Sequence, residues 1–62
     1  EYKKIAVDKD MTIKKLISIL DTNAINEVVV YENGEEKKIF SQKEIENLIE
    51  NSNLYSKISE SL

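Results

Sequence analysis

The chain of 62 residues contains no cysteine, no histidine, no proline and no tryptophan. The lack of cysteine excludes disulfides, thiolate zinc sites and iron–sulfur clusters. The lack of histidine excludes imidazole catalysis and histidine-ligated metals, so a general base would have to be a carboxylate, a lysine or a tyrosine. A chain of this size buries only about 60% of the surface that its unfolded form exposes. We therefore expect it to be supported by a partner surface.

Arginine is also absent, and the nine basic residues are all lysines against twelve acidic residues, for a net charge of −3. Without arginine the chain lacks the bidentate donors that recognise phosphates and guanine edges, so we expect no nucleic-acid partner. The longest apolar run, residues 28–31, is far shorter than the roughly 20 residues that span a bilayer. We expect no membrane insertion and a cytoplasmic location. The first residue is Glu1, as in a piece of a longer protein.

The first part of the chain predicts a strand followed by a helix. Residues 2–7 read as a short extended segment with Ile5 and Val7 on one side. Thr12 is a suitable N-cap, and the residues after it place one apolar stripe at helical spacing: Ile13, Leu16, Ile17 and Leu20. The sequence therefore predicts a helix over residues 12–22.

The middle of the chain predicts a β-hairpin. Residues 28–31 (VVVY) favour a strand, and the lack of alternation indicates that both of its faces are covered. Asn33 and Gly34 are typical of a type I′ turn, which needs positive φ at both central positions. The return strand is expected over residues 35–40, with a lysine-rich, exposed edge. The expected pairs are Glu32–Glu35, Tyr31–Glu36, Val30–Lys37, Val29–Lys38 and Val28–Ile39.

The last part predicts a capped helix and a tail. In residues 41–44 (SQKE) the Ser41 hydroxyl can accept from the Glu44 amide while the Glu44 carboxylate accepts from the Ser41 amide, a capping box. Phe40 and Ile45 stand where a hydrophobic staple would place them. The tail carries Leu54, Tyr55 and Ile58 and either packs back or reaches a partner.

These elements give the order β-α-β-β-α, an α/β (α+β) fold in which a short sheet carries two helices on one face. We expect residues 1–62 to form one small domain. No nucleophile–base pair or glycine-rich phosphate loop can be assembled from them, so we expect neither an enzyme nor a catalytic residue. Glu32, Glu35 and Glu36 surround the turn but lack the alternating spacing of a calcium loop, so no metal is expected.

The order and several short motifs resemble a single motif of the cystathionine-β-synthase (CBS) domain family. Residues 5–13 (IAVDKDMTI) resemble the family's extended opening, polar turn and helix start. Residues 25–31 (INEVVVY) resemble its "isoleucine, two residues, apolar-Pro-Val-Val" strand. Residues 39–45 (IFSQKEI) resemble the segment with Ser/Thr-x-x-Asp that opens the second helix. Residues 57–62 (KISESL) resemble the ending that leads into a following repeat. The resemblance covers nearly the whole chain.

The resemblance implies regulation without catalysis. CBS motifs work in pairs, packed sheet to sheet, so the chain would be half of a pair with a second copy or an adjacent repeat, or a fragment of a longer chain with an attached enzyme or transporter. Many such pairs bind an adenine nucleotide or S-adenosylmethionine in the cleft between motifs; no other cofactor is implied. The contacts implied here are Ile5, Val7, Val28, Val29, Val30, Lys38, Ser41 and Glu44.

Three positions depart from the family pattern. Glu44 stands where aspartate is usual, Lys38 where glycine often is, and Val29 where proline is usual. Most of the proposed contacts also have a structural explanation: Ser41 and Glu44 as a helix cap, Lys38 as a charge that blocks edge pairing, and Val28, Val29 and Val30 as a buried strand. The alternative function is therefore a protein-interaction or dimerisation domain with no small-molecule ligand.

Overall fold

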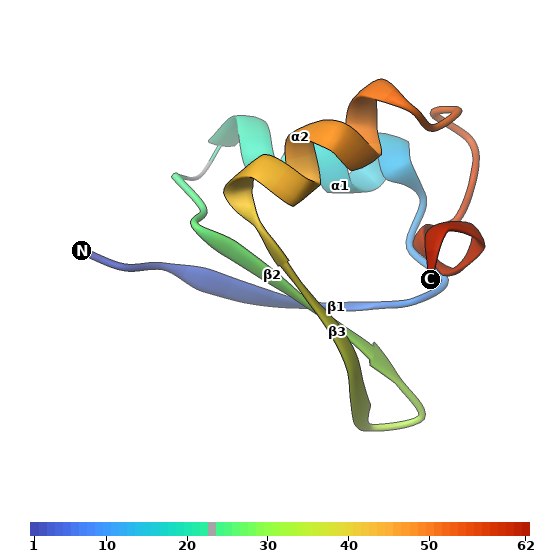
Figure 1. Cartoon of the computed structure of the whole chain (residues 1–62), viewed down its shortest axis with the longest axis horizontal. Coiled ribbons are helices and arrows are strands. Elements are labelled where there is room, and N and C mark those ends of the chain that lie inside the picture. Colours follow the sequence, from blue (N-terminus) through green and yellow to red (C-terminus); the bar gives the residue numbers. More distant parts are fainter. Residues whose placement is uncertain (23) are drawn as a thin grey trace.

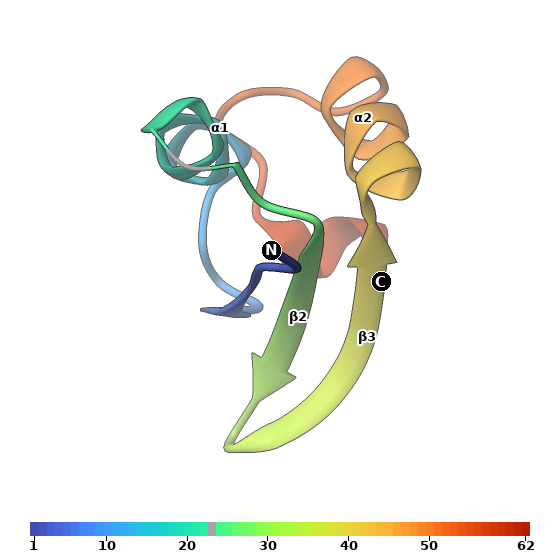
Figure 2. The same cartoon turned by 90° about the vertical axis from the view of Figure 1, so that its left-hand side faces the viewer.

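The computed structural model describes residues 1–22 and 24–62. Three strands, β1 (Lys4–Asp8), β2 (Glu27–Glu32) and β3 (Glu35–Ser41), form one sheet in the order β1-β2-β3. β1 is parallel to β2, and β3 is antiparallel to it. The helices α1 (Ile13–Thr22) and α2 (Gln42–Glu50) lie on the same side of the sheet, and a short 3-10 helix, η1 (Ile58–Ser61), follows them (Figures 1 and 2). The predicted α/β (α+β) fold is confirmed.

The core lies between the sheet and the two helices. Its sheet side is formed by strand residues that alternate in sequence, as a period of two requires, and its other side by the helices and the tail. Its members are Val7, Val28, Val30, Phe40, Ile13, Leu16, Ile25, Ile45, Leu48 and Ile58. Val29 is 7% exposed but stands apart from this cluster, because it points to the opposite face. It pairs there with Ala6 and Ile39, and we call these three residues the open face.

The hairpin register differs from the prediction beyond its first two pairs. Glu32–Glu35 and Tyr31–Glu36 form as expected, but the register then shifts, so that the next pairs are Val30–Lys38, Val29–Ile39 and Val28–Phe40. The predicted pairs Val30–Lys37, Val29–Lys38 and Val28–Ile39 are wrong by one residue. A β-bulge absorbs the extra residue and turns the Phe40 ring into the core, where it is 5% exposed, while Ile39 remains 43% exposed.

Local signals in the sequence account for the element boundaries. The Thr12 hydroxyl accepts from the Lys15 amide at 3.1 Å, so the N-cap is confirmed, and α1 begins one residue later than predicted. Asn33 and Gly34 have φ values of 51° and 82°, as the tight turn requires. β3 extends to Ser41, one residue further than predicted.

The tail runs back along the start of α1. The Ile13 amide donates to the Ser56 carbonyl at 2.9 Å, and the Lys14 amide donates to the Leu54 carbonyl at 2.8 Å. Ile58 is fully buried, whereas the Tyr55 ring is exposed and lies 5.7 Å from the Lys14 ammonium. Of the two alternatives for the tail, packing back is the one observed for Ile58.

Candidate functional site

The aliphatic residues among the predicted ligand contacts are divided between the two faces of the sheet. Val7, Val28 and Val30 lie in the core beneath the helices, and Ile5 packs against that core. Val29 is buried on the open face. The three core valines have almost no exposed surface, so little of these side chains is available to a ligand in this structure.

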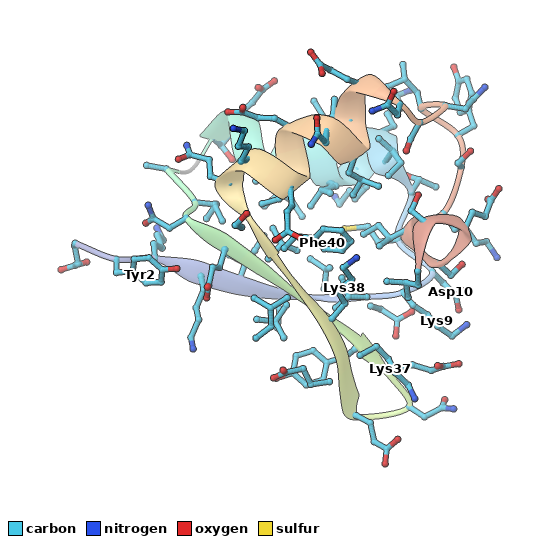
Figure 3. All side chains as sticks on the ribbon, in the orientation of Figure 1. Tyr2, Lys9, Asp10, Lys37, Lys38 and Phe40 are labelled. Atoms are coloured by element: carbon cyan, nitrogen blue, oxygen red, sulfur yellow. The ribbon has the colours of Figure 1, made fainter. Side chains whose placement is uncertain are left out.

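The polar members of the predicted set come together where β3 passes into α2. Lys38, Ser41 and Glu44 are all exposed there. The Ser41 amide donates to the Glu44 Oε1 at 3.0 Å, and the Glu44 amide donates to the Ser41 Oγ at 3.3 Å, which confirms the capping box. The Lys38 ammonium lies 4.9 Å from the centre of the Phe40 ring (Figure 3). Lys38 stands two residues before Phe40 and therefore lies on the same, helix-facing side of β3.

The charge of this cluster follows from its hydrogen bonds. The bond from the Ser41 backbone, followed by that from the Ser41 side chain and the positive charge of Lys38, lowers the pKa of the Glu44 carboxyl below its ordinary value of 4.5. Glu44 is therefore ionised at neutral pH and occupies the N-terminus of α2, where a phosphate would otherwise accept from free amides. A carboxylate has acceptor capacity for hydroxyl groups as well, so the cluster suits a sugar hydroxyl better than an anion.

Ser41 also borders the open face. It pairs with Glu27 at the end of β3 and lies two residues beyond Ile39, hence on the same face of the sheet. The Tyr2 side chain, 67% exposed, approaches the same margin, and its hydrogen bond to Glu27 is the main cause that raises the pKa of its phenol (Figure 3). A molecule seated against the open face would therefore lie beside Ser41.

A pocket of about 200 Å³ between the end of α1 and α2 was not predicted. It is lined mainly by apolar side chains, with two polar ones: Leu20, Ala24, Ile25, Gln42, Ile45, Glu46 and Ile49. None of these belongs to the predicted contact set. The spacing of Leu20 and Ile49 places each of them on an apolar stripe. The pocket, however, depends on the distance between two helices, and the periodicity of one helix carries no information about that distance.

Two of the carboxylates at the hairpin tip, those of Glu32 and Glu35, lie near lysines. The Lys37 ammonium lies 3.8 Å from a carboxylate oxygen of Glu32 and 3.8 Å from one of Glu35, and the Lys9 ammonium lies 3.8 Å from the other Glu32 oxygen. Within residues 1–22 and 24–62, no three acidic, histidine or cysteine side chains are arranged to hold a metal ion. The tip is a charged, solvated turn.

Comparisons with known proteins give no assignment. No protein-family model matches the chain, and neither the curated proteins nor the solved structures yield a significantly similar relative. In the described part of the chain, neither helix has the length and apolar character needed to cross a membrane.

Proposed function

We propose that the chain is a non-catalytic, cytoplasmic regulatory module that pairs through its open face with a second copy or an adjacent repeat. The observation that carries the proposal is the contrast between the two faces of the sheet. One face is covered by the helices and carries the core, whereas the other leaves Ala6 and Ile39 exposed beside the buried Val29, with Ile39 43% exposed. Covering this apolar surface would supply burial that a small domain lacks.

The ligand in this proposal is an adenine nucleotide or S-adenosylmethionine, bound between the paired modules. Ser41 and Glu44 offer hydroxyl and carboxylate acceptors for ribose hydroxyls. Lys38, whose charge helps to lower the pKa of Glu44, offers a positive charge on the helix-facing side of β3. Because Ser41 borders the open face, a ligand there would contact both modules. It would favour the docking arrangement that it binds more tightly, and this shift would pass to an attached enzyme or transporter.

The second candidate is a protein-interaction or dimerisation domain without a small-molecule ligand. The completed capping box favours it, since Ser41 and Glu44 bond each other and the Glu44 charge opposes a phosphate at the N-terminus of α2. In this case the open face alone would carry the function.

A thermal-shift titration with AMP, ADP, ATP and S-adenosylmethionine separates the two candidates. The regulatory module predicts a saturable rise in melting temperature with one of them, worth about 2.7 kcal/mol at a ligand concentration one hundred times Kd. Lys38→Ala should weaken that shift, while Lys15→Ala, which removes the same charge from the exposed side of α1, should not. If none of these ligands raises the melting temperature of a protein that melts cooperatively, the ligand-free interaction domain is the candidate that remains.

Pairing through the open face is tested separately by Ile39→Asp. A charge within a docked apolar face is costly, so self-association measured by sedimentation should weaken. Leu54→Asp is the matched control, because Leu54 is 46% exposed and lies on the tail. Equal association of the two variants would reject this face as the docking surface.

A further inference from the structure

The two edges of the sheet are protected to different degrees. The β3 edge carries Lys37 and Lys38 and is interrupted by a β-bulge, both of which discourage the addition of another strand. The β1 edge has no bulge in its pairing with β2 and carries the small Ala6 at its centre. In the described part of the chain β1 has a neighbouring strand on one side only, and in Figure 2 it forms the left margin of the sheet.

The backbone groups on this edge can be assigned from the bonds that flank β1. The Glu27 amide donates to the Lys3 carbonyl at 3.3 Å, and the Lys9 amide donates to the Tyr31 carbonyl at 2.9 Å. Since alternate residues of a strand bond to the same neighbour, the odd-numbered residues of β1 face β2. The amides of Lys4, Ala6 and Asp8 and the carbonyls of Lys4 and Ala6 therefore point outward, along the exposed edge. The Asp8 carbonyl, at the end of the strand, accepts from the Met11 amide at 3.1 Å.

We infer that β1 is an association edge that pairs antiparallel with β1 of a second copy, with Ala6 opposite Ala6 at the two-fold axis. In this register Lys4 of each copy lies opposite Asp8 of the other, and opposite charges facing each other across strands are stabilising. Both side chains lie on the open-face side, because Ile5 and Val7 between them point to the helices. Ile5 of each copy lies opposite Val7 of the other on the helix side.

This arrangement goes beyond the proposed function, which concerns the open face. The two-fold axis of an antiparallel pair stands perpendicular to the sheet, so both copies keep their helices on the same side. The sheet then continues through both copies, and the two open faces lie next to each other. The strand has only five residues, so we expect a dimer that dissociates on dilution.

Charge reversal tests the register. Lys4→Glu places two acidic residues opposite each other at both ends of the paired strands, and Asp8→Lys places two lysines there. Each variant alone should raise the dimer Kd by about tenfold or more, measured by sedimentation, because two pairs change from attraction to repulsion. A mixture of the two variants restores both ion pairs and should form a heterodimer. Lys15→Glu, with the same charge change on α1, should dimerise as the unmodified chain does.

Repeating the series in the Ile39→Asp background isolates the edge from the open face. Asp8→Lys removes a turn contact, since the Asp8 carboxylate accepts from the Asp10 amide at 2.9 Å, so each variant is first checked for a cooperative melt.

The unmodified chain supplies a second readout: the amides of Lys4, Ala6 and Asp8 should exchange more slowly in concentrated than in dilute protein. The inference is overturned if these amides show no concentration dependence, or if the mixed variants associate no more tightly than either alone. Neither result would affect a ligand-induced thermal shift, so the proposed function stands or fails separately.

Discussion

The backbone amide of Ile58 donates a hydrogen bond to the carbonyl of Met11 at 2.9 Å, which ties the tail to the loop before α1. An isolated bridge between Thr12 and Lys57 lies beside this bond. The Ile58 side chain is fully buried and belongs to the main core. Ile58 therefore belongs to the same core as β1, and the tail packs as part of this domain.

Shortening Ile58 should show how strongly the tail supports the fold. Ile58→Ala is expected to cost about 2–5 kcal/mol of unfolding free energy, since a buried isoleucine loses both its transfer energy and its packing. Leu54→Ala, at a side chain that is 46% exposed, should cost much less. Urea unfolding of both variants measures the difference, and similar losses would show that the tail does not pack as described.

Removal of the α2 cap separates the structural role of Ser41 from a ligand role. Ser41→Ala should cost about 1 kcal/mol, because the Glu44 amide loses its acceptor. Ser18→Ala removes a hydroxyl from the exposed side of α1, outside any cap, and should leave stability nearly unchanged. If a nucleotide that shifts the melting temperature binds folded Ser41→Ala with unaltered affinity, Ser41 is a cap only.

The features that the sequence predicted best are local ones. Thr12 caps α1, Ser41 and Glu44 form their capping box, and Asn33 with Gly34 makes the turn, because each depends on groups within a few residues of each other. The open face required the sheet order, and the pocket between α1 and α2 required the distance between two helices. The spacing of residues within one helix or strand predicts neither the sheet order nor the distance between helices.

The regular pairing that the sequence predicts for the hairpin is wrong beyond its first two pairs, and the reason is physical. A two-residue turn predicts regular pairing, which would place Ile39 against the core and Phe40 on the open face. The aromatic ring buries more apolar surface, and a bulge after the first two pairs allows it to point inward. The competition between these two side chains depends on the helices above the sheet, which the hairpin sequence does not describe.

The bulged register predicts opposite sensitivities for two adjacent residues. Phe40→Ala should cost about 3–5 kcal/mol and largely unfold so small a domain, because the ring is 5% exposed within the core. Ile39→Ala, at a side chain that is 43% exposed, should be tolerated. Circular dichroism melts of the two variants show which substitution lowers the melting temperature more. The reverse order would support the regular register and remove the bulge.

The pKa of Glu44 predicts a loss of stability in acid. The bond from the Ser41 backbone, that from its side chain and the charge of Lys38 lower this pKa in the folded chain below its ordinary value of 4.5. A depressed folded pKa means that the contribution is complete above the ordinary pKa and is lost as the pH falls through the folded value. Glu44→Gln keeps an acceptor for the Ser41 amide but removes the charge.

At neutral pH the unmodified chain should therefore melt above Glu44→Gln, and this difference should shrink as the pH falls through the folded pKa of Glu44. Melting curves of both proteins at neutral and acidic pH measure it. Glu46→Gln removes the same charge from α2 outside the capping box and corrects for net charge. A difference between the unmodified chain and Glu44→Gln that stays constant with pH would show that the ionised carboxylate is not held by the cap.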